Sequence, residues 1–98
     1  DIDACAAQSV RDAEAAMNRA ATQLMDQLKI RDRAAGNRNG EERLIAAQRT
    51  WIAFRDAQCR LAGLQAIDGS LEPVLIAQCL ADMNGRRVDD LRMMLIGR

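Results

Sequence analysis

The sequence predicts an all-α protein, a small antiparallel bundle of three to four helices stapled by a disulfide. No segment shows the alternating pattern of a β-strand, and residues 3–35 contain neither Gly nor Pro. Short turn-forming stretches at 36–42 and 68–70 divide the rest of the chain, and such short connections favour antiparallel neighbours. A chain of 98 residues makes one domain, so residues 1–98 are expected to fold as a single unit.

The first predicted helix covers residues 3–35, where apolar residues recur every seven positions at Val10, Met17 and Leu24. This spacing places them on one helix face. The stretch "GNRNGEE" at 36–42 has the composition of a turn. The second predicted helix runs from about Glu41 to Ala66.

The third predicted helix follows the stretch "DGS" at 68–70. Ser70 is expected to cap its N-terminus, and Pro73 falls in its first turn, where a missing N–H costs nothing. The pair "NG" at 84–85 either kinks this helix or starts a fourth one capped by Asn84, which would run over 87–96. Met93 and Met94 near its end are expected to be core residues rather than a partner-binding patch.

The balance of charge excludes several classes of protein. The chain has 14 basic and 14 acidic residues and no basic stripe, which argues against binding to nucleic acid or anionic membrane. No apolar run approaches the length of about 20 residues that a membrane-spanning helix needs. The chain begins at Asp1 without Met, so a segment upstream is expected.

The residues available for catalysis or metal binding are few. The chain has no His and no Tyr, its three cysteines are far apart, and its carboxylates are spread over all helix faces. Zinc sites need clustered Cys or His, and acid–base catalysis needs positioned titratable groups. The sequence therefore predicts a non-catalytic protein without a metal or cofactor.

The cysteines at 5, 59 and 79 are either disulfide-bonded in an oxidising compartment or inert buried thiols. Cys59 and Cys79 lie ten residues before and after Gly69, the centre of the second turn. Residues equally distant from the turn of a helical hairpin lie level, so these two are predicted to form a disulfide. Across the first turn, Cys59 is expected to lie level with about residue 17. Cys5 is therefore expected to lie roughly 18 Å from the level of Cys59, at about 1.5 Å per residue.

The stretch "QRTWIAFRDAQC" at 48–59 contains the only Trp and the only Phe of the chain. Gln48, Trp51, Arg55 and Cys59 share one helix face. Arg55 is therefore expected to be half-buried and to bond acceptors on a neighbouring helix. It is interpreted as a structural tie rather than as a recognition residue.

The stretches "LIAAQRTWIAFRDAQC" and "AQCLADMNGRRVDDL" resemble the LprI-like lysozyme-inhibitor family of bacterial cell-envelope proteins. The residues that match the family pattern are Leu44, Gln48, Arg49, Trp51, Ile52, Phe54, Arg55, Asp56, Cys59, Cys79, Arg87 and Leu91. Cys5, Glu14, Met17 and Asn18 resemble its first helix, although Ala21 stands where an aromatic residue is usual. Within this pattern, Gln48, Trp51, Arg55, Asp56 and Arg87 are interpreted as structural residues.

The resemblance implies a periplasmic, secreted or lipid-anchored protein that binds and blocks lysozyme or a related peptidoglycan hydrolase. The alternative is a scaffold or adaptor module in envelope assembly that has no hydrolase target. Candidate partner-binding residues are Arg38 in the first turn, and Asp68 and Ser70 in the second. Taken singly, each turn is more simply explained as a mere connection.

The resemblance also bears on Cys5. The family has a further Cys just upstream of the matching position, and this chain begins too late to include it. Cys5 is therefore expected to be bonded to that absent residue, free, or paired between chains.

Overall fold

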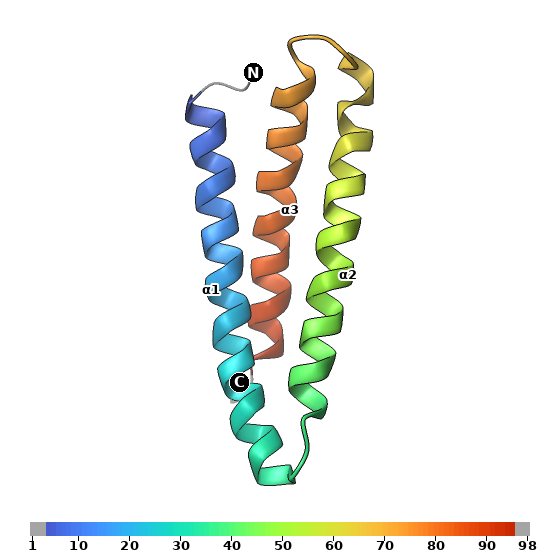
Figure 1. The fold of residues 1–98 in the computed structure, drawn as a ribbon. Coiled ribbons are helices and arrows are strands. Elements are labelled where there is room, and N and C mark those ends of the chain that lie inside the picture. Colours follow the sequence, from blue (N-terminus) through green and yellow to red (C-terminus); the bar gives the residue numbers. More distant parts are fainter. Residues whose placement is uncertain (1–3, 96–98) are drawn as a thin grey trace.

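The computed structural model describes residues 4–95, which form three long helices arranged side by side (Figure 1). These are α1 (Ala4–Ala35), α2 (Asn39–Ala62) and α3 (Glu72–Met94), with a short 3-10 helix η1 (Gly63–Ala66) between α2 and α3. Successive helices run antiparallel, and the described residues contain no strand, so the predicted all-α bundle is confirmed. None of the described helices is long and apolar enough to cross a membrane.

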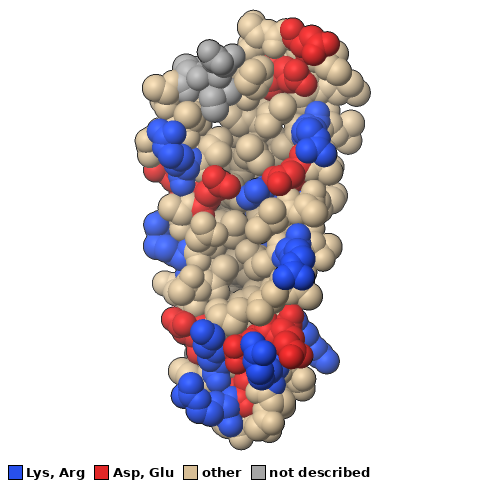
Figure 2. Space-filling view, in the orientation of Figure 1, with Lys and Arg blue, Asp and Glu red and all other residues tan. Residues whose placement is uncertain are grey.

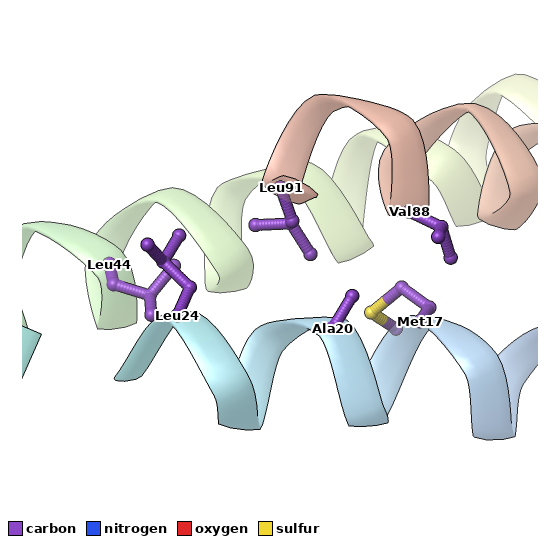
Figure 3. Close-up of a cluster of buried hydrophobic side chains, with 6 residues drawn as sticks. All are labelled: Met17, Ala20, Leu24, Leu44, Val88 and Leu91. Carbon is purple, nitrogen blue, oxygen red and sulfur yellow. The ribbon is translucent and has the colours of Figure 1, made fainter. Parts of the chain in front are cut away.

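The hydrophobic core lies between α1, α2 and α3 in the half of the bundle that holds the α1–α2 turn (Figures 1 and 3). Its buried members are Met17, Ala20, Leu24, Leu44, Val88 and Leu91. The predicted seven-residue repeat is confirmed at Met17 and Leu24, which are 2% and 1% exposed. Val10, one repeat earlier, is only half-buried. The core is built from aliphatic and Met side chains, as the composition requires.

The α1–α2 turn is organised by a buried carboxylate, Asp32. Its Oδ1 accepts a hydrogen bond from the backbone N–H of Gly40 at 3.0 Å, and its Oδ2 accepts one from Glu41 at 2.9 Å. Asp32 thus satisfies two N–H groups that the first turn of α2 leaves free. A Cβ on Gly40 would lie 2.9 Å from Asp32 Oδ1, so only Gly allows this approach. The capped α2 begins at Asn39, two residues before the predicted start at Glu41.

The α2–α3 connection differs from the prediction in one respect. The sequence predicts Ser70 as the cap of α3, but the N-cap residue is Leu71, and no side chain caps the helix. The carboxylate of Glu72 instead reaches back and accepts a hydrogen bond from the backbone N–H of Asp68 at 3.0 Å. Asp68 has a φ of 62°, a left-handed conformation that an Asp tolerates better than most residues. Pro73 occupies the first turn of α3, as predicted.

Helix α3 continues through Asn84, which therefore does not start a fourth helix. The side chain of Asn84 is fully buried and bonded to α2, so it is not available as a cap. The prediction that Met93 and Met94 are core residues is wrong, because they are 72% and 47% exposed. Leu91 occupies the inward face instead. The predicted helix ends at residues 3 and 96 lie outside the described residues.

A disulfide joins Cys59 of α2 to Cys79 of α3, with the two Cα atoms 5.4 Å apart. The pairing predicted from the hairpin geometry is confirmed. Cys5, near the start of α1, is a free and exposed thiol.

Candidate functional site

A buried polar cluster lies where the middle of α2 faces α3. We call it the arginine junction, and its members are Gln48, Trp51, Arg55, Asn84 and Arg87. Two arginines in the interior of so small a bundle need partners, because an unpaired buried charge is strongly unfavourable. The contacts of each arginine show what the junction can do.

Arg55 is 7% exposed and contacts all three helices. Its guanidinium donates a hydrogen bond to Asn84 Oδ1 on α3 at 3.1 Å. It also bonds the carboxylate of its neighbour Asp56 through Nε at 2.9 Å, with a second nitrogen at 2.8 Å, and lies 3.7 Å from Glu14 on α1. Arg55 therefore ties the three helices together at one level of the bundle.

Arg87 forms the second half of the junction. Its Nε donates a hydrogen bond to Gln48 Oε1 at 2.7 Å, and Gln48 in turn contacts Met17 Sδ at 3.1 Å. The guanidinium carbons of Arg55 and Arg87 each lie 5.5 Å from the centroid of the Trp51 ring, which is within cation–π range. Burial lowers the pKa of the Arg87 guanidinium below its usual value, an effect that the nearby charge of Asp90 opposes.

The geometry of the junction suits a structural tie better than a reactive site. Arg55 and Arg87 each already bond a neighbouring side chain. The ring of Trp51 lies against the Arg55 guanidinium and carries no charge itself. Over residues 4–95, no three His, Cys, Asp or Glu side chains gather closely enough to hold a metal ion. The exposed turns at the two ends of the bundle carry the candidate partner-binding residues that the sequence named.

The two turns that supplied candidate partner-binding residues lie at opposite ends of the bundle, whose longest dimension is 53 Å (Figure 1). Arg38, in the α1–α2 turn, is exposed and lies 3.5 Å from Glu41. Asp68 and Ser70, both exposed, lie in the α2–α3 connection. The structure therefore brings Asp68 and Ser70 together and separates Arg38 from them, so one compact site cannot contain all three.

The end that carries Asp68 also exposes an apolar surface. We call it the apolar cap, and its members are Leu61, Leu64, Ile67 and Leu71, which are 61%, 56%, 61% and 61% exposed. Sequence reasoning missed this cap, because apolar residues three or four apart are typical of a buried helix face. Several large apolar side chains exposed at one end make this surface a candidate interaction site.

Charge is distributed unevenly between the two ends, although the chain as a whole is neutral. Residues 61–85 contain no Lys or Arg but three acids, Asp68, Glu72 and Asp82. In Figure 2 this end is mostly uncharged with acidic patches, whereas Lys and Arg gather around the α1–α2 turn with several acids. This asymmetry was visible in the sequence but is hidden by the sum of charges.

Sequence reasoning also missed the roles of Asn84 and Asp32. Asn84 beside a Gly has the appearance of a turn, and its partner Arg55 is 29 positions away. Asp32 caps a helix that begins seven residues later, beyond the spacing of any local capping motif. Neither role leaves a signal in the local sequence, because each depends on which helices pack together.

Comparison with known proteins connects this architecture to a family. The sequence profile described as "Lysozyme inhibitor LprI" matches residues 1–91. An uncharacterized protein of Rhizobium meliloti (strain 1021) is 35% identical over 100 residues, which cover 97% of this chain and 72% of that protein. No solved structure matches the chain. Since the family profile covers nearly the whole helical bundle, this chain belongs to the lysozyme inhibitor LprI family.

Proposed function

We propose that this chain is a non-catalytic envelope protein that binds and blocks lysozyme or a related peptidoglycan hydrolase through its apolar cap. The observation that supports this proposal is the group of four apolar side chains, each more than half exposed, around the acidic Asp68 turn. An apolar centre with a polar rim is the usual composition of a protein–protein interface.

Electrostatics favours a basic partner at this end. Asp68 and Glu72 lie in a stretch of chain, 61–85, that contains no basic residue. A basic hydrolase would be attracted to this surface, whereas basic and acidic side chains are mixed around the opposite turn, and this difference orients the encounter. Asp68 is held by the bond from its N–H to Glu72, so little ordering is needed on binding.

The Cys59–Cys79 disulfide supports two parts of the proposal, the rigidity of the apolar cap and the cellular compartment of the protein. It joins the two helices whose ends carry the cap. Disulfides persist in oxidising compartments, which agrees with a periplasmic, secreted or outer-envelope lipoprotein. Inhibition by a rigid surface of this kind needs no catalytic residue.

Turbidity assays test the proposal: lysozymes of several types digest a bacterial suspension with and without the intact, oxidised protein. We expect inhibition, and we expect the double variant Leu64→Ser, Ile67→Ser to weaken it by roughly tenfold or more, as the loss of interface anchors does. Asp68→Asn should weaken inhibition without straining the backbone, because Asn also tolerates a positive φ.

Two control variants separate the cap from other surfaces. Asp82→Asn removes an equivalent exposed charge from α3, and Arg38→Gln alters the opposite turn; both should inhibit like the parent. Inhibition that survives the cap variants would place the binding surface elsewhere. A folded protein that fails to inhibit any lysozyme at large molar excess would instead favour the scaffold or adaptor function.

A further inference from the structure

The end of the bundle opposite the apolar cap contains a pocket of about 410 Å³. It lies where α3 ends at Met94, short of the α1–α2 turn (Figure 1). Leu28, Leu44 and Ala47 line the pocket, and Met94 at the end of α3 forms part of its wall.

The charged lining of this pocket is entirely basic, and Asn39 is its one uncharged polar side chain. Its charged members are Arg31, Arg43 and Arg87, and no carboxylate lines it. Arg31 is engaged by Asp32 at 2.7 Å. Arg43 has no ion-pair partner among the described residues, so it remains available to an anion in the pocket.

Arg87 is the more informative of the two remaining arginines. Its side chain is nine-tenths buried, with an exposed fraction of 9%, yet it lines the pocket. Its Nε bonds Gln48, while its terminal nitrogens have no hydrogen-bond partner among residues 4–95. Apart from Asn84 Nδ2, no buried side-chain nitrogen or oxygen of the described residues lacks a hydrogen-bond partner, so the terminal N–H groups of Arg87 are not enclosed. A guanidinium held at Nε beside a cavity can bond an anion even with the charge of Asp90 nearby, and a carboxylate matches its planar geometry.

We propose that this pocket binds a small amphiphilic carboxylate. The carboxylate bonds the free N–H groups of Arg87 and the guanidinium of Arg43, and a short aliphatic tail packs against Leu28, Leu44 and Ala47. The volume is in the range of small-molecule sites, which combine apolar walls with a few placed polar groups. The apolar walls favour such a ligand over a simple inorganic anion, because each buried methylene contributes about 0.8 kcal/mol.

Calorimetric titration of the intact protein at neutral pH tests this proposal without any hydrolase, so its outcome is independent of the proposed inhibition. The probe is decanoate, kept below the concentration at which it forms micelles. Acetate lacks the tail and decanol lacks the charge, so both should bind at least about tenfold more weakly. Equal binding of decanol, or no binding of decanoate, would overturn the proposal.

Two pairs of variants on α2 locate the ligand. Ala47→Phe fills the pocket, whereas Ala46→Phe makes the same change at an exposed position that does not line it. Arg43→Gln removes a pocket charge, and Arg49→Gln removes an exposed charge elsewhere on the helix. We expect only the two pocket variants to raise the Kd for decanoate, by roughly tenfold. If each variant and its control bind alike, the ligand lies outside this pocket.

Trp51 provides a second readout, because its ring centroid is 5.5 Å from the guanidinium carbon of Arg87. A carboxylate that bonds Arg87 changes the charge beside the only Trp of the chain. Decanoate should therefore shift the Trp emission of the parent and of Ala46→Phe, and leave that of Ala47→Phe unchanged. An identical shift in Ala47→Phe would contradict the assignment of the pocket.

Discussion

The Oδ1 atom of Asn84 lies 3.1 Å from a guanidinium nitrogen of Arg55, and this hydrogen bond joins α3 to α2 inside the bundle. Asn84 is completely buried, and its own Nδ2 finds no partner in the part of the chain that the structure describes. Burial of Asn84 thus provides one hydrogen bond to the charged Arg55, while leaving the Nδ2 donor of Asn84 unsatisfied.

Replacing Asn84 by Ala should lower the free energy of unfolding by about 2 kcal/mol, the range for a hydrogen bond to a charged group. The destabilisation by Asn84→Ala should be smaller by about 1 kcal/mol or more in an Arg55→Met background, because Asn84 Oδ1 then no longer accepts a hydrogen bond from a charged donor. Urea unfolding of the two single variants and the double variant measures this coupling. Additive effects would show that the bond contributes nothing specific.

Trp51 is expected to be a structural spacer between the two arginines. Trp51→Ala should cost about 3 kcal/mol, the lower end for large-to-small changes at an aromatic residue, since the ring is only half-buried. Phe54→Ala on the same helix removes a ring that is 56% exposed and should change stability by less than about 0.5 kcal/mol. A Trp51→Ala variant that melts like the parent would mark Trp51 as a recognition residue instead.

Asp32 should make the stability of the bundle sensitive to acid. Burial raises the pKa of its carboxyl, but the hydrogen bonds from Glu41 and Gly40 and the contact with Arg31 outweigh burial, so the pKa lies below its ordinary value. A depressed folded-state pKa gives a stabilisation that is present above the unfolded pKa of about 3.9 and is lost as pH falls through the folded value.

Asp32→Asn should therefore be less stable than the parent at neutral pH, and the difference should shrink as pH falls below about 4. Urea unfolding across this pH range measures it. Asp26→Asn, an exposed change on the same helix, serves as the control and should follow the parent. A gap between Asp32→Asn and the parent that stays constant with pH would show that the carboxylate charge is not what caps α2.

The disulfide should contribute about 3 kcal/mol, because it closes a loop with a sequence separation of 20 residues. The double variant Cys59→Ala, Cys79→Ala should unfold at correspondingly lower urea. Cys5→Ser changes an exposed free thiol and should leave the midpoint unaltered. Non-reducing peptide mapping supplies an independent check, and a peptide linking Cys5 to either of the other two cysteines would contradict the observed pairing.

The helices and their order were predictable because their signals are local. Helical periodicity at Met17 and Leu24, Gly and Asn in the first turn, and Pro73 at the start of α3 act within a few residues of where they stand. The Cys59–Cys79 pairing was also predictable, since antiparallel helices place residues level when they are equally distant from the turn.

The sequence also indicated that Arg55 would bond a neighbouring helix, but it did not identify the acceptor. Isolated residue preferences predict a kink or a helix start at Asn84 and a cap at Ser70. In the structure Glu72 occupies the turn beside Ser70, and Arg55 holds Asn84 inside the bundle. Contacts between helices outweighed local preference at both positions.

By itself, the sequence determined three features: the all-α fold, the hairpin disulfide, and the face of α2 that carries Trp51 and Arg55. Only the tertiary structure decided which apolar residues stay exposed at the cap, how Asp32 caps α2, and where a pocket lies beside the end of α3. The physical reason is that helix formation and turn placement depend on neighbours along the chain. Exposure and cavities depend on the relative lengths and rotations of helices, which no single segment encodes.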